Sequence, residues 1–170
     1  MNKVYLAGGC FWCIQDYISS FPGIKKVISG YSGGKEKAVT YKEVKEQKTG
    51  HRETIEVSYN EEEVSLNEII DIYLSYVDPL DKEGQFIDKG FSYTLALFYQ
   101  NEVERNLFEQ KIKELETKLN HEVYINVLPF SFFIEAEEYH QDYSKKNPDN
   151  FYQELVNSSR VCHLAKYKKN

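Results

Sequence analysis

Cysteine is scarce in this chain: three cysteines occur in 170 residues, an odd and small number. Secreted domains that depend on disulfides carry denser sets of paired cysteines, so the count argues against a disulfide framework. Residues 1–8 contain no long apolar segment typical of a signal peptide, and no run approaches the roughly 20 apolar residues that span a bilayer. We therefore expect the protein to lie in the reducing cytoplasm, where cysteines are catalytic, metal-binding or inert.

A dense basic stripe is also missing: the formal net charge is −6, and the Lys-rich end, 166–169, is short. Nucleic-acid binding requires dense basic patches, so nucleic acid is not an expected partner. Hydrophobic residues make up 41% and aromatic residues 15%, which is a globular composition. The length suits one domain with its own core. We expect a single catalytic domain over 1–170, with 151–170 as a flexible tail.

Hydrophobic periodicity predicts an alternation of strands and helices. The predicted strands are 4–7, 27–31, 55–59, 93–99 and 123–127, and the predicted helices are 14–21, 66–77 and 102–119. The polar segment 35–52 is expected to be a long loop, and the aromatic-rich segment after Pro129 to be irregular. This order predicts an α+β fold: a two-layer α/β sandwich with a mainly antiparallel, ferredoxin-like sheet and an irregular C-terminal segment.

Residues 9–13, Gly-Cys-Phe-Trp-Cys, come directly before the first predicted helix. Cys10 is therefore expected at a helix N-terminus, where unpaired backbone N–H groups and the helix macrodipole favour a thiolate over a thiol. Such positions lower a cysteine pKa well below about 8.5, and the thiolate is the nucleophilic form. The two aromatic residues after the cysteine, Phe11 and Trp12, indicate a substrate that carries an apolar group.

Cys13 lies one helical turn after Cys10, and three interpretations of the pair remain open. Cys13 is an inert buried cysteine, or the two form a Cys-x-x-Cys redox pair that approaches disulfide distance. In the third interpretation both bind zinc together with Cys162 and His163. The zinc interpretation is the weakest, because Cys162 and His163 are adjacent whereas structural ligand pairs usually have residues between them.

Glu53 begins a predicted strand in which the odd positions form the apolar face. Its carboxyl group is therefore expected on the core side at the end of the strand, although most glutamates are solvated. Burial would raise its pKa and keep it protonated near neutral pH, which makes it a proton donor. A thiolate nucleophile and a neutral carboxylic acid together define a class of reaction.

Several further residues are candidates on weaker grounds. His140 lies among aromatic and acidic residues of the irregular segment, so a place in the lining of a site is plausible. Asp88 lies in a polar turn shortly before a predicted strand, and Tyr41 lies in the predicted loop. The chain contains 14 tyrosines, so any one of them is more often a packing residue than a catalytic one.

Six motifs in order resemble the A-type peptide methionine sulfoxide reductases over about residues 4–148. They are Gly9-Cys10-Phe11-Trp12, Gly-Tyr-Ser-Gly-Gly at 30–34, Thr-Tyr-Lys-Glu-Val at 40–44, Gly-His-Arg-Glu at 50–53, Asp88 with Gly90 and Tyr93, and Glu-Tyr-His-Gln-Asp-Tyr at 138–143 followed by Lys146-Asn147-Pro148. The resemblance implies reduction of the S epimer of methionine sulfoxide, free or in proteins, without a metal or an organic cofactor.

The resemblance implies four catalytic residues. Cys10 attacks the sulfoxide sulfur as a thiolate and is left as a sulfenic acid. Glu53 protonates the sulfoxide oxygen, and the hydroxyl groups of Tyr41 and Tyr93 donate hydrogen bonds to it. A neutral acid and two phenols suit a basic oxygen that becomes a leaving hydroxyl.

The resemblance also implies a substrate-binding slot. Phe11 and Trp12 hold the ε-methyl group of the substrate, and Asp88 and His140 line or orient the site. The segment 88–94 differs from the family pattern around its aspartate and tyrosine.

The resolving thiol stays open between two cysteines. A sulfenic acid condenses with a neighbouring thiol, and Cys13 stands where the family usually has glycine, while Cys162 stands in place of the usual glycine-rich, cysteine-bearing tail. We favour Cys13, although closing a longer loop to Cys162 costs little extra. Thioredoxin or a similar dithiol then reduces the disulfide, and we expect a monomer. The alternative function is a general thiol–disulfide oxidoreductase using Cys10 and Cys13, which leaves Glu53 without a task.

Overall fold

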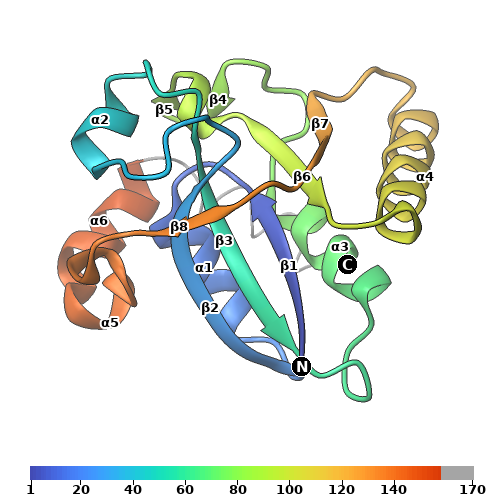
Figure 1. The fold of residues 1–170 in the computed structure, drawn as a ribbon, viewed down its shortest axis with the longest axis horizontal. Coiled ribbons are helices and arrows are strands. Elements are labelled where there is room, and N and C mark those ends of the chain that lie inside the picture. The colour runs from blue at the N-terminus through green and yellow to red at the C-terminus, as the bar shows by residue number, and fades with distance from the viewer. Residues whose placement is uncertain (158–170) are drawn as a thin grey trace.

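The computed structural model describes residues 1–157 and contains a six-stranded sheet in the order β7-β6-β1-β3-β2-β8 (Figure 1). Neighbouring strands of this sheet run antiparallel except for the parallel pair β6 and β7. A separate two-stranded hairpin pairs β4 with β5. The strands are β1 Asn2–Ala7, β2 Ile24–Ser32, β3 Arg52–Tyr59, β4 Gly84–Gln85, β5 Asp88–Lys89, β6 Leu95–Tyr99, β7 Ile125–Pro129 and β8 Phe133–Glu135.

Helices lie against the sheet and around its ends. They are α1 Phe11–Ser19, α2 Tyr41–Lys45, α3 Leu66–Tyr76, α4 Glu102–Leu119, α5 Tyr143–Lys146 and α6 Pro148–Asn157, with short 3₁₀ turns η1 Phe91–Tyr93 and η2 Glu138–His140. Helix α1 packs on β2 and β3, and α4 packs on β6 and β7. In Figure 1, α5 and α6 lie at one end of the molecule and α4 at the other. The predicted mixture of helices and strands is confirmed.

The second face of the sheet is also covered. The ring of Tyr5 stacks on Phe130 with centroids 3.9 Å apart and lies 5.6 Å from Phe133. In Figure 1 the orange segment from β7 to β8 crosses in front of the other strands. All eight residues of β3 are therefore buried, whereas the alternation of apolar and polar residues predicts burial of the odd positions only. The covering comes from residues more than 70 positions later in the chain, which local periodicity does not reveal.

Two segments predicted to lack regular structure contain short elements. The predicted loop 35–52 includes α2, which begins with a capping box between Thr40 and Glu43 and buries only Val44. A helix of five residues is too short to display an apolar stripe, so the periodicity missed it. After Pro129 the chain forms β8, η2, α5 and α6, so this segment is not irregular throughout.

Two boundaries also differ from the predictions. Tyr93 lies in η1 rather than in the following strand, and β7 is followed by a further strand, β8. Helix α6 extends over the beginning of the predicted tail, with Phe151 buried in the core. The remainder of that tail, with Cys162 and His163, lies outside the described residues. Within residues 1–157, none of the helices combines the length and apolar character that crossing a bilayer requires.

Candidate active site

Cys10 lies at the N-cap of α1, as the sequence predicts. Strand β1 ends at Ala7, and Gly9 makes the turn toward the helix with a positive φ of +85°, a conformation that favours glycine. The carbonyl oxygen of Cys10 accepts hydrogen bonds from the amides of Cys13 and Ile14 at 3.2 and 3.3 Å. The cysteine is 9% exposed. Its side chain therefore stands at the positive end of a helix, in a nearly dry environment.

Glu53 lies at the same helix N-terminus, although 42 residues separate it from Phe11 in the chain. Its Oε1 atom accepts a hydrogen bond of 3.0 Å from the backbone N–H of Phe11, the residue after Cys10. The residue is 2% exposed. The predicted orientation of Glu53 toward the core side is confirmed, and the fold brings this carboxyl group next to the cysteine.

The hydroxyl groups of Tyr41 and Tyr93 complete a polar cluster. Burial raises the pKa of Tyr41, the electrostatic effects of Glu53 and Cys10 raise it further, and a hydrogen bond from Tyr93 acts in the opposite direction. Burial also raises the pKa of Tyr93, followed by the effects of Glu53, Tyr41 and Asp88. Both phenols are therefore protonated at neutral pH and can donate hydrogen bonds to an oxygen atom in the site.

Aromatic rings form a wall beside this polar cluster. The ring centroid of Phe11 lies 6.1 Å from that of Tyr41 and 5.2 Å from that of His140. The ring of Trp12 stacks on Tyr143 at 3.9 Å with an interplanar angle of 8°. These contacts place Phe11 and Trp12, the two residues after Cys10, in an apolar environment that suits a small apolar group of a ligand.

His140 is held in one tautomer by the indole of Trp12. The indole Nε1–H is a donor only, and it donates to His140 Nδ1 at 3.0 Å. Nε2 therefore carries the proton, and this buried atom has no hydrogen-bond partner among the described residues. Burial lowers the pKa of His140, while the charge of Glu137 acts in the opposite direction. The imidazole is neutral and offers one N–H group to a polar ligand atom.

Glu137 is a residue of the site region that the sequence analysis did not identify. It accepts hydrogen bonds from the hydroxyl of Tyr31 at 2.9 Å and from the backbone N–H of Tyr41 at 3.0 Å. Burial acts to raise the pKa of Glu137, but the backbone N–H groups of Tyr41 and Glu137 and the hydroxyl of Tyr31 lower it overall. Glu137 thereby fixes the first residue of α2. A glutamate just before a motif carries no sequence signal of this role.

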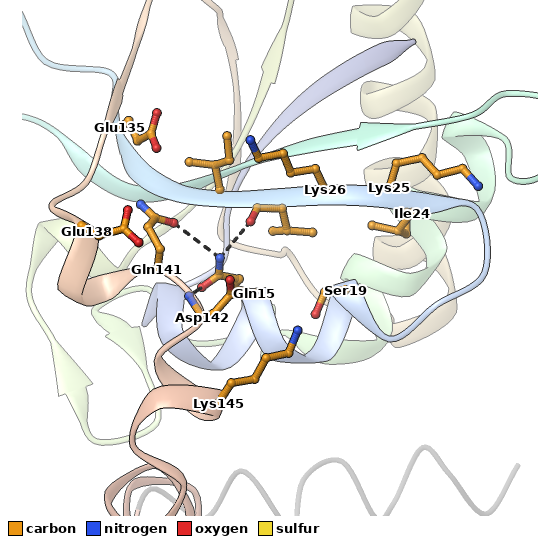
Figure 2. A pocket seen from close by; sticks show the side chains of 12 residues that line it. Gln15, Ser19, Ile24, Lys25, Lys26, Glu135, Glu138, Gln141, Asp142 and Lys145 are labelled. Atoms are coloured by element: carbon orange, nitrogen blue, oxygen red, sulfur yellow. Dashed lines mark hydrogen bonds between the residues drawn. The ribbon is translucent and has the colours of Figure 1, made fainter.

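Two buried glutamines hold the His140 segment to the edge of β2 (Figure 2). Gln15 donates to the carbonyl of Val27 at 2.8 Å and to Gln141 at 3.5 Å. The Gln141 amide accepts from the N–H of Ser29 at 2.9 Å and donates to its carbonyl at 2.8 Å, as a neighbouring strand would. The hollow around them, about 450 Å³, is lined by none of the predicted site residues. The two glutamines act on the site indirectly: their hydrogen bonds hold Gln141 in place, and Gln141 is the residue next to His140.

Of the residues proposed as a resolving thiol or as zinc ligands besides Cys10, the structure describes Cys13 alone. Cys13 is 2% exposed and faces the core from α1. Cys162 and His163, which the zinc interpretation requires, lie outside the described residues. Within 1–157 there is no group of three or more His, Cys, Asp or Glu residues placed to hold a metal ion.

A cysteine at a helix start, a buried carboxyl group at the same helix end and two protonated phenols define a thiol-dependent enzyme. Residues 2–170 match the family model of peptide methionine sulfoxide reductase. The chain belongs to this family.

Sequence relatives cover the whole chain. Over 174 aligned positions it is 41% identical to peptide methionine sulfoxide reductase MsrA 2 of Staphylococcus aureus, covering 100% of this chain and 98% of that protein. It is 40% identical over 163 positions to peptide methionine sulfoxide reductase MsrA of Bacillus licheniformis, covering 95% and 90%.

Solved structures share the fold. Mxr1 from Saccharomyces cerevisiae in reduced form superposes with a TM-score of 0.83 at 30% identity, covering 87% of this chain and 86% of that one. Methionine sulfoxide reductase A of Corynebacterium diphtheriae gives 0.77 at 25% identity, covering 86% and 74%. Mxr1 from Saccharomyces cerevisiae in complex with Trx2 gives 0.57 at 21% identity, covering 84% of each chain.

Proposed function

We propose that this protein reduces the S epimer of methionine sulfoxide, free or in proteins, to methionine. The observation that carries the proposal is the hydrogen bond of 3.0 Å from the Phe11 N–H to Glu53, because it joins the acid to the helix end that bears Cys10. Membership of the family and the names of the relatives support the choice of substrate.

The chemical step uses one nucleophile and three proton or hydrogen-bond donors. The Cys10 thiolate attacks the sulfoxide sulfur, and Glu53 gives a proton to the sulfoxide oxygen. Tyr41 and Tyr93 donate hydrogen bonds to that oxygen as the S–O bond polarises. The S–O bond of the substrate breaks as the hydroxyl passes to Cys10, and the transient bond between Cys10 and the substrate sulfur breaks as methionine leaves. Overall the substrate sulfur is reduced, Cys10 is oxidised to a sulfenic acid and one proton is consumed.

Substrate binding is assigned to the aromatic wall and its polar neighbours. Phe11 and Trp12 contact the ε-methyl group. His140 offers its Nε2–H to a polar atom of the substrate, and Asp88 orients the site from β5. The charge of Asp88 acts on both Tyr41 and Tyr93, which supports its place beside the reacting oxygen.

Regeneration begins when the sulfenic acid of Cys10 condenses with a second thiol, with loss of water, to form a disulfide. We assign this thiol to Cys13, which lies one turn further along α1, with Cys162 as the alternative. Thioredoxin or a similar dithiol then reduces the disulfide. The structure of Mxr1 from Saccharomyces cerevisiae with Trx2 bound supports this partner.

Two substitutions test the catalytic assignment. Cys10→Ser is expected to abolish sulfoxide reduction, and Glu53→Gln to slow it by about 100-fold or more. The glutamine keeps an oxygen that accepts from the Phe11 N–H, so folding should be preserved. The measurement is a single-turnover assay on separated sulfoxide epimers, with circular dichroism as the folding control. Wild-type turnover in Glu53→Gln would remove the acid role, and equal use of both epimers would remove the S preference.

Peptide mapping tests the resolving cysteine. After one turnover with sulfoxide in the absence of a dithiol, we expect a disulfide between Cys10 and Cys13, formed also in Cys162→Ser. A disulfide between Cys10 and Cys162 that survives in Cys13→Ser would assign the role to Cys162 instead.

The proposal also covers the topology of the sheet, the number of domains, the oligomeric state and the cellular location. The order β6-β1-β3-β2 at the centre of the sheet, with α1 after β1 and α3 after β3, supports a ferredoxin-like arrangement. We assign the chain a single catalytic domain, a monomeric state and a cytoplasmic location. Light scattering on the purified protein, with a mass other than 20.0 kDa, would contradict the monomer.

A further inference from the structure

Tyr93 lies at a point in the fold where backbone pairing does not fix its distance from Glu53. Strand β1 separates β3 from β6, and its last pairs are Leu6 with Ile55 and Ala7 with Ala96. Glu53 and Tyr93 both lie beyond these pairs, on either side of the gap that the end of β1 leaves. Side chains must therefore set the spacing of the two groups.

Gln47 holds the residue before Tyr93. It follows α2, the helix that begins at Tyr41, and has a positive φ of 67°. Its Oε1 accepts from the backbone N–H of Ser92 at 2.7 Å, and its Nε2 donates to the Ser92 hydroxyl at 2.9 Å. A Cβ at Gly90 would lie 2.7 Å from the Gln47 amide carbon. The glycine thus lets the amide lie flat against this turn.

Arg52 holds the residue after Tyr93. It directly precedes Glu53, and its Nε donates to the hydroxyl of Thr94 at 2.9 Å. Its Nη2 donates to Asn126 Oδ1 at 2.8 Å, and the ring of Phe91 lies 4.4 Å from the guanidinium carbon.

The guanidinium of Arg52 is buried. The residue is 5% exposed, and burial lowers the pKa of Arg52. Burying a charge in this way is costly unless its N–H groups are satisfied. The planar guanidinium of arginine donates in fixed directions, and here two of its N–H groups join β3 to Thr94, the residue before β6, and to Asn126 in β7.

We infer that Gln47 and Arg52 are positioning residues that set the Tyr93 hydroxyl against Tyr41 and Glu53. Gln47 connects η1 to the element that carries Tyr41, and Arg52 connects it to the strand that carries Glu53. The inference rests on the role of Tyr93 in the proposed function. Its consequence is kinetic, because displacement of a catalytic group by about 1 Å can cost up to about 100-fold in rate.

Two substitutions test the two connections. Gln47→Gly removes the amide, and glycine accepts the positive φ without strain. Thr94→Val replaces the acceptor of Arg52 with a side chain of the same shape, and it also removes the hydrogen bond of 2.6 Å that the Thr94 hydroxyl donates to the Phe91 carbonyl. We expect each to lower the single-turnover rate by about 10-fold with little change in KM. Asn120→Gly is the matched control, because Asn120 has a φ of 52° at the end of α4, and it should keep the wild-type rate.

A double-mutant cycle separates positioning from general structural damage. In a Tyr93→Phe background, Gln47→Gly and Thr94→Val should have no further effect on the rate, since both act through the lost hydroxyl. The rate at which iodoacetamide alkylates Cys10, measured by peptide mass spectrometry, should be the same in all variants as in the wild type. The inference would be overturned if Gln47→Gly or Thr94→Val lowered the rate further in the Tyr93→Phe background. Slower alkylation of Cys10 in these variants would overturn it as well.

The same experiment distinguishes failure of the inference from failure of the function. Wild-type turnover in Tyr93→Phe would overturn the catalytic role of Tyr93 and the inference with it. A slow Tyr93→Phe enzyme together with a Gln47→Gly variant at the wild-type rate would overturn the inference alone. Gln47 is exposed, so its substitution leaves the core intact and the test does not depend on Thr94→Val folding.

Discussion

His140 shows how neighbouring side chains decide the charge of a single residue. The Trp12 indole occupies one ring nitrogen, and burial lowers the pKa of the imidazole. The neutral form is therefore the native form. Protonation would place a positive charge in the aromatic wall and bring a donor N–H against the Trp12 donor.

Stability should depend on pH through this residue. In the unfolded chain His140 titrates near about 6.5, above its lowered native pKa, so as pH falls the unfolded state binds the proton first. The stability that the neutral imidazole contributes is present above that pH and lost on acidification. Glu137, whose pKa is also lowered, contributes a separate loss at lower pH, below about 4.5.

The variant His140→Asn tests this dependence, because asparagine Oδ1 can still accept from Trp12 but does not titrate. Urea denaturation at pH 7.5 and 5.5 should show a larger loss of unfolding free energy in the wild type than in the variant. Equal losses in the two proteins would contradict the prediction.

At the scale of elements, β2 and β8 approach each other unusually closely at one position. A Cβ at Gly30 would lie 2.2 Å from the carbonyl oxygen of Ile134 and 2.4 Å from the ring of Phe133. Only a residue without a side chain lets β8 pair with β2 here. This pairing directs the chain toward Glu137 and His140.

Gly30→Ala should therefore push β8 away from β2. We expect a loss of about 1–3 kcal/mol in unfolding free energy, as for other overpacked positions, measured by urea denaturation. Lys26→Ala is the control, since Lys26 is exposed on β2 outside the β8 pairing, and it should change stability by less than about 0.5 kcal/mol. An unchanged Gly30→Ala midpoint would show that the strands can separate at no cost.

At the scale of the whole molecule, the C-terminal segment is tied to the sheet by side chains as well as by β8. Gln141 is 8% exposed and bonds to both backbone groups of Ser29. Its amide also donates to the carbonyl of Ala136 at 3.1 Å. The segment with His140 therefore depends on a buried amide for its position.

Gln141→Leu keeps the bulk of this side chain but removes the acceptor of the Ser29 N–H, while the Ser29 carbonyl keeps the hydrogen bond of 2.9 Å from the Ala136 N–H. An unsatisfied buried group costs about 1–3 kcal/mol, so we expect a loss of unfolding free energy of that size, together with faster amide exchange at Ser29. Thermal unfolding and hydrogen exchange measure the two effects. Gln110→Leu, at an exposed site on α4, is the control and should be close to neutral. Native-like exchange at Ser29 in Gln141→Leu would contradict the role.

Local pattern in the sequence determined the start of the site. The apolar stripe after Cys10 predicted a helix there, and the alternation in 55–59 predicted the core-side orientation of Glu53; both are confirmed. These features depend on the periods of 3.6 and 2.0 residues, which the backbone imposes on any chain. The short helix α2 was not predictable in this way because it is too short to show a period. The strand β8 and the full burial of β3 were not predictable because they depend on contacts between distant segments.

Only the tertiary structure decided which polar groups meet. The bond between Phe11 and Glu53 joins residues 42 positions apart, and the bond between Tyr41 and Glu137 joins residues 96 positions apart. Polar side chains such as Gln47 and Arg52 follow no period, so the sequence leaves their partners undetermined. The order of the strands and the end of β1 at Ala7 bring these polar side chains together. The burial of the core, rather than these few hydrogen bonds, supplies most of the free energy that stabilises this strand order.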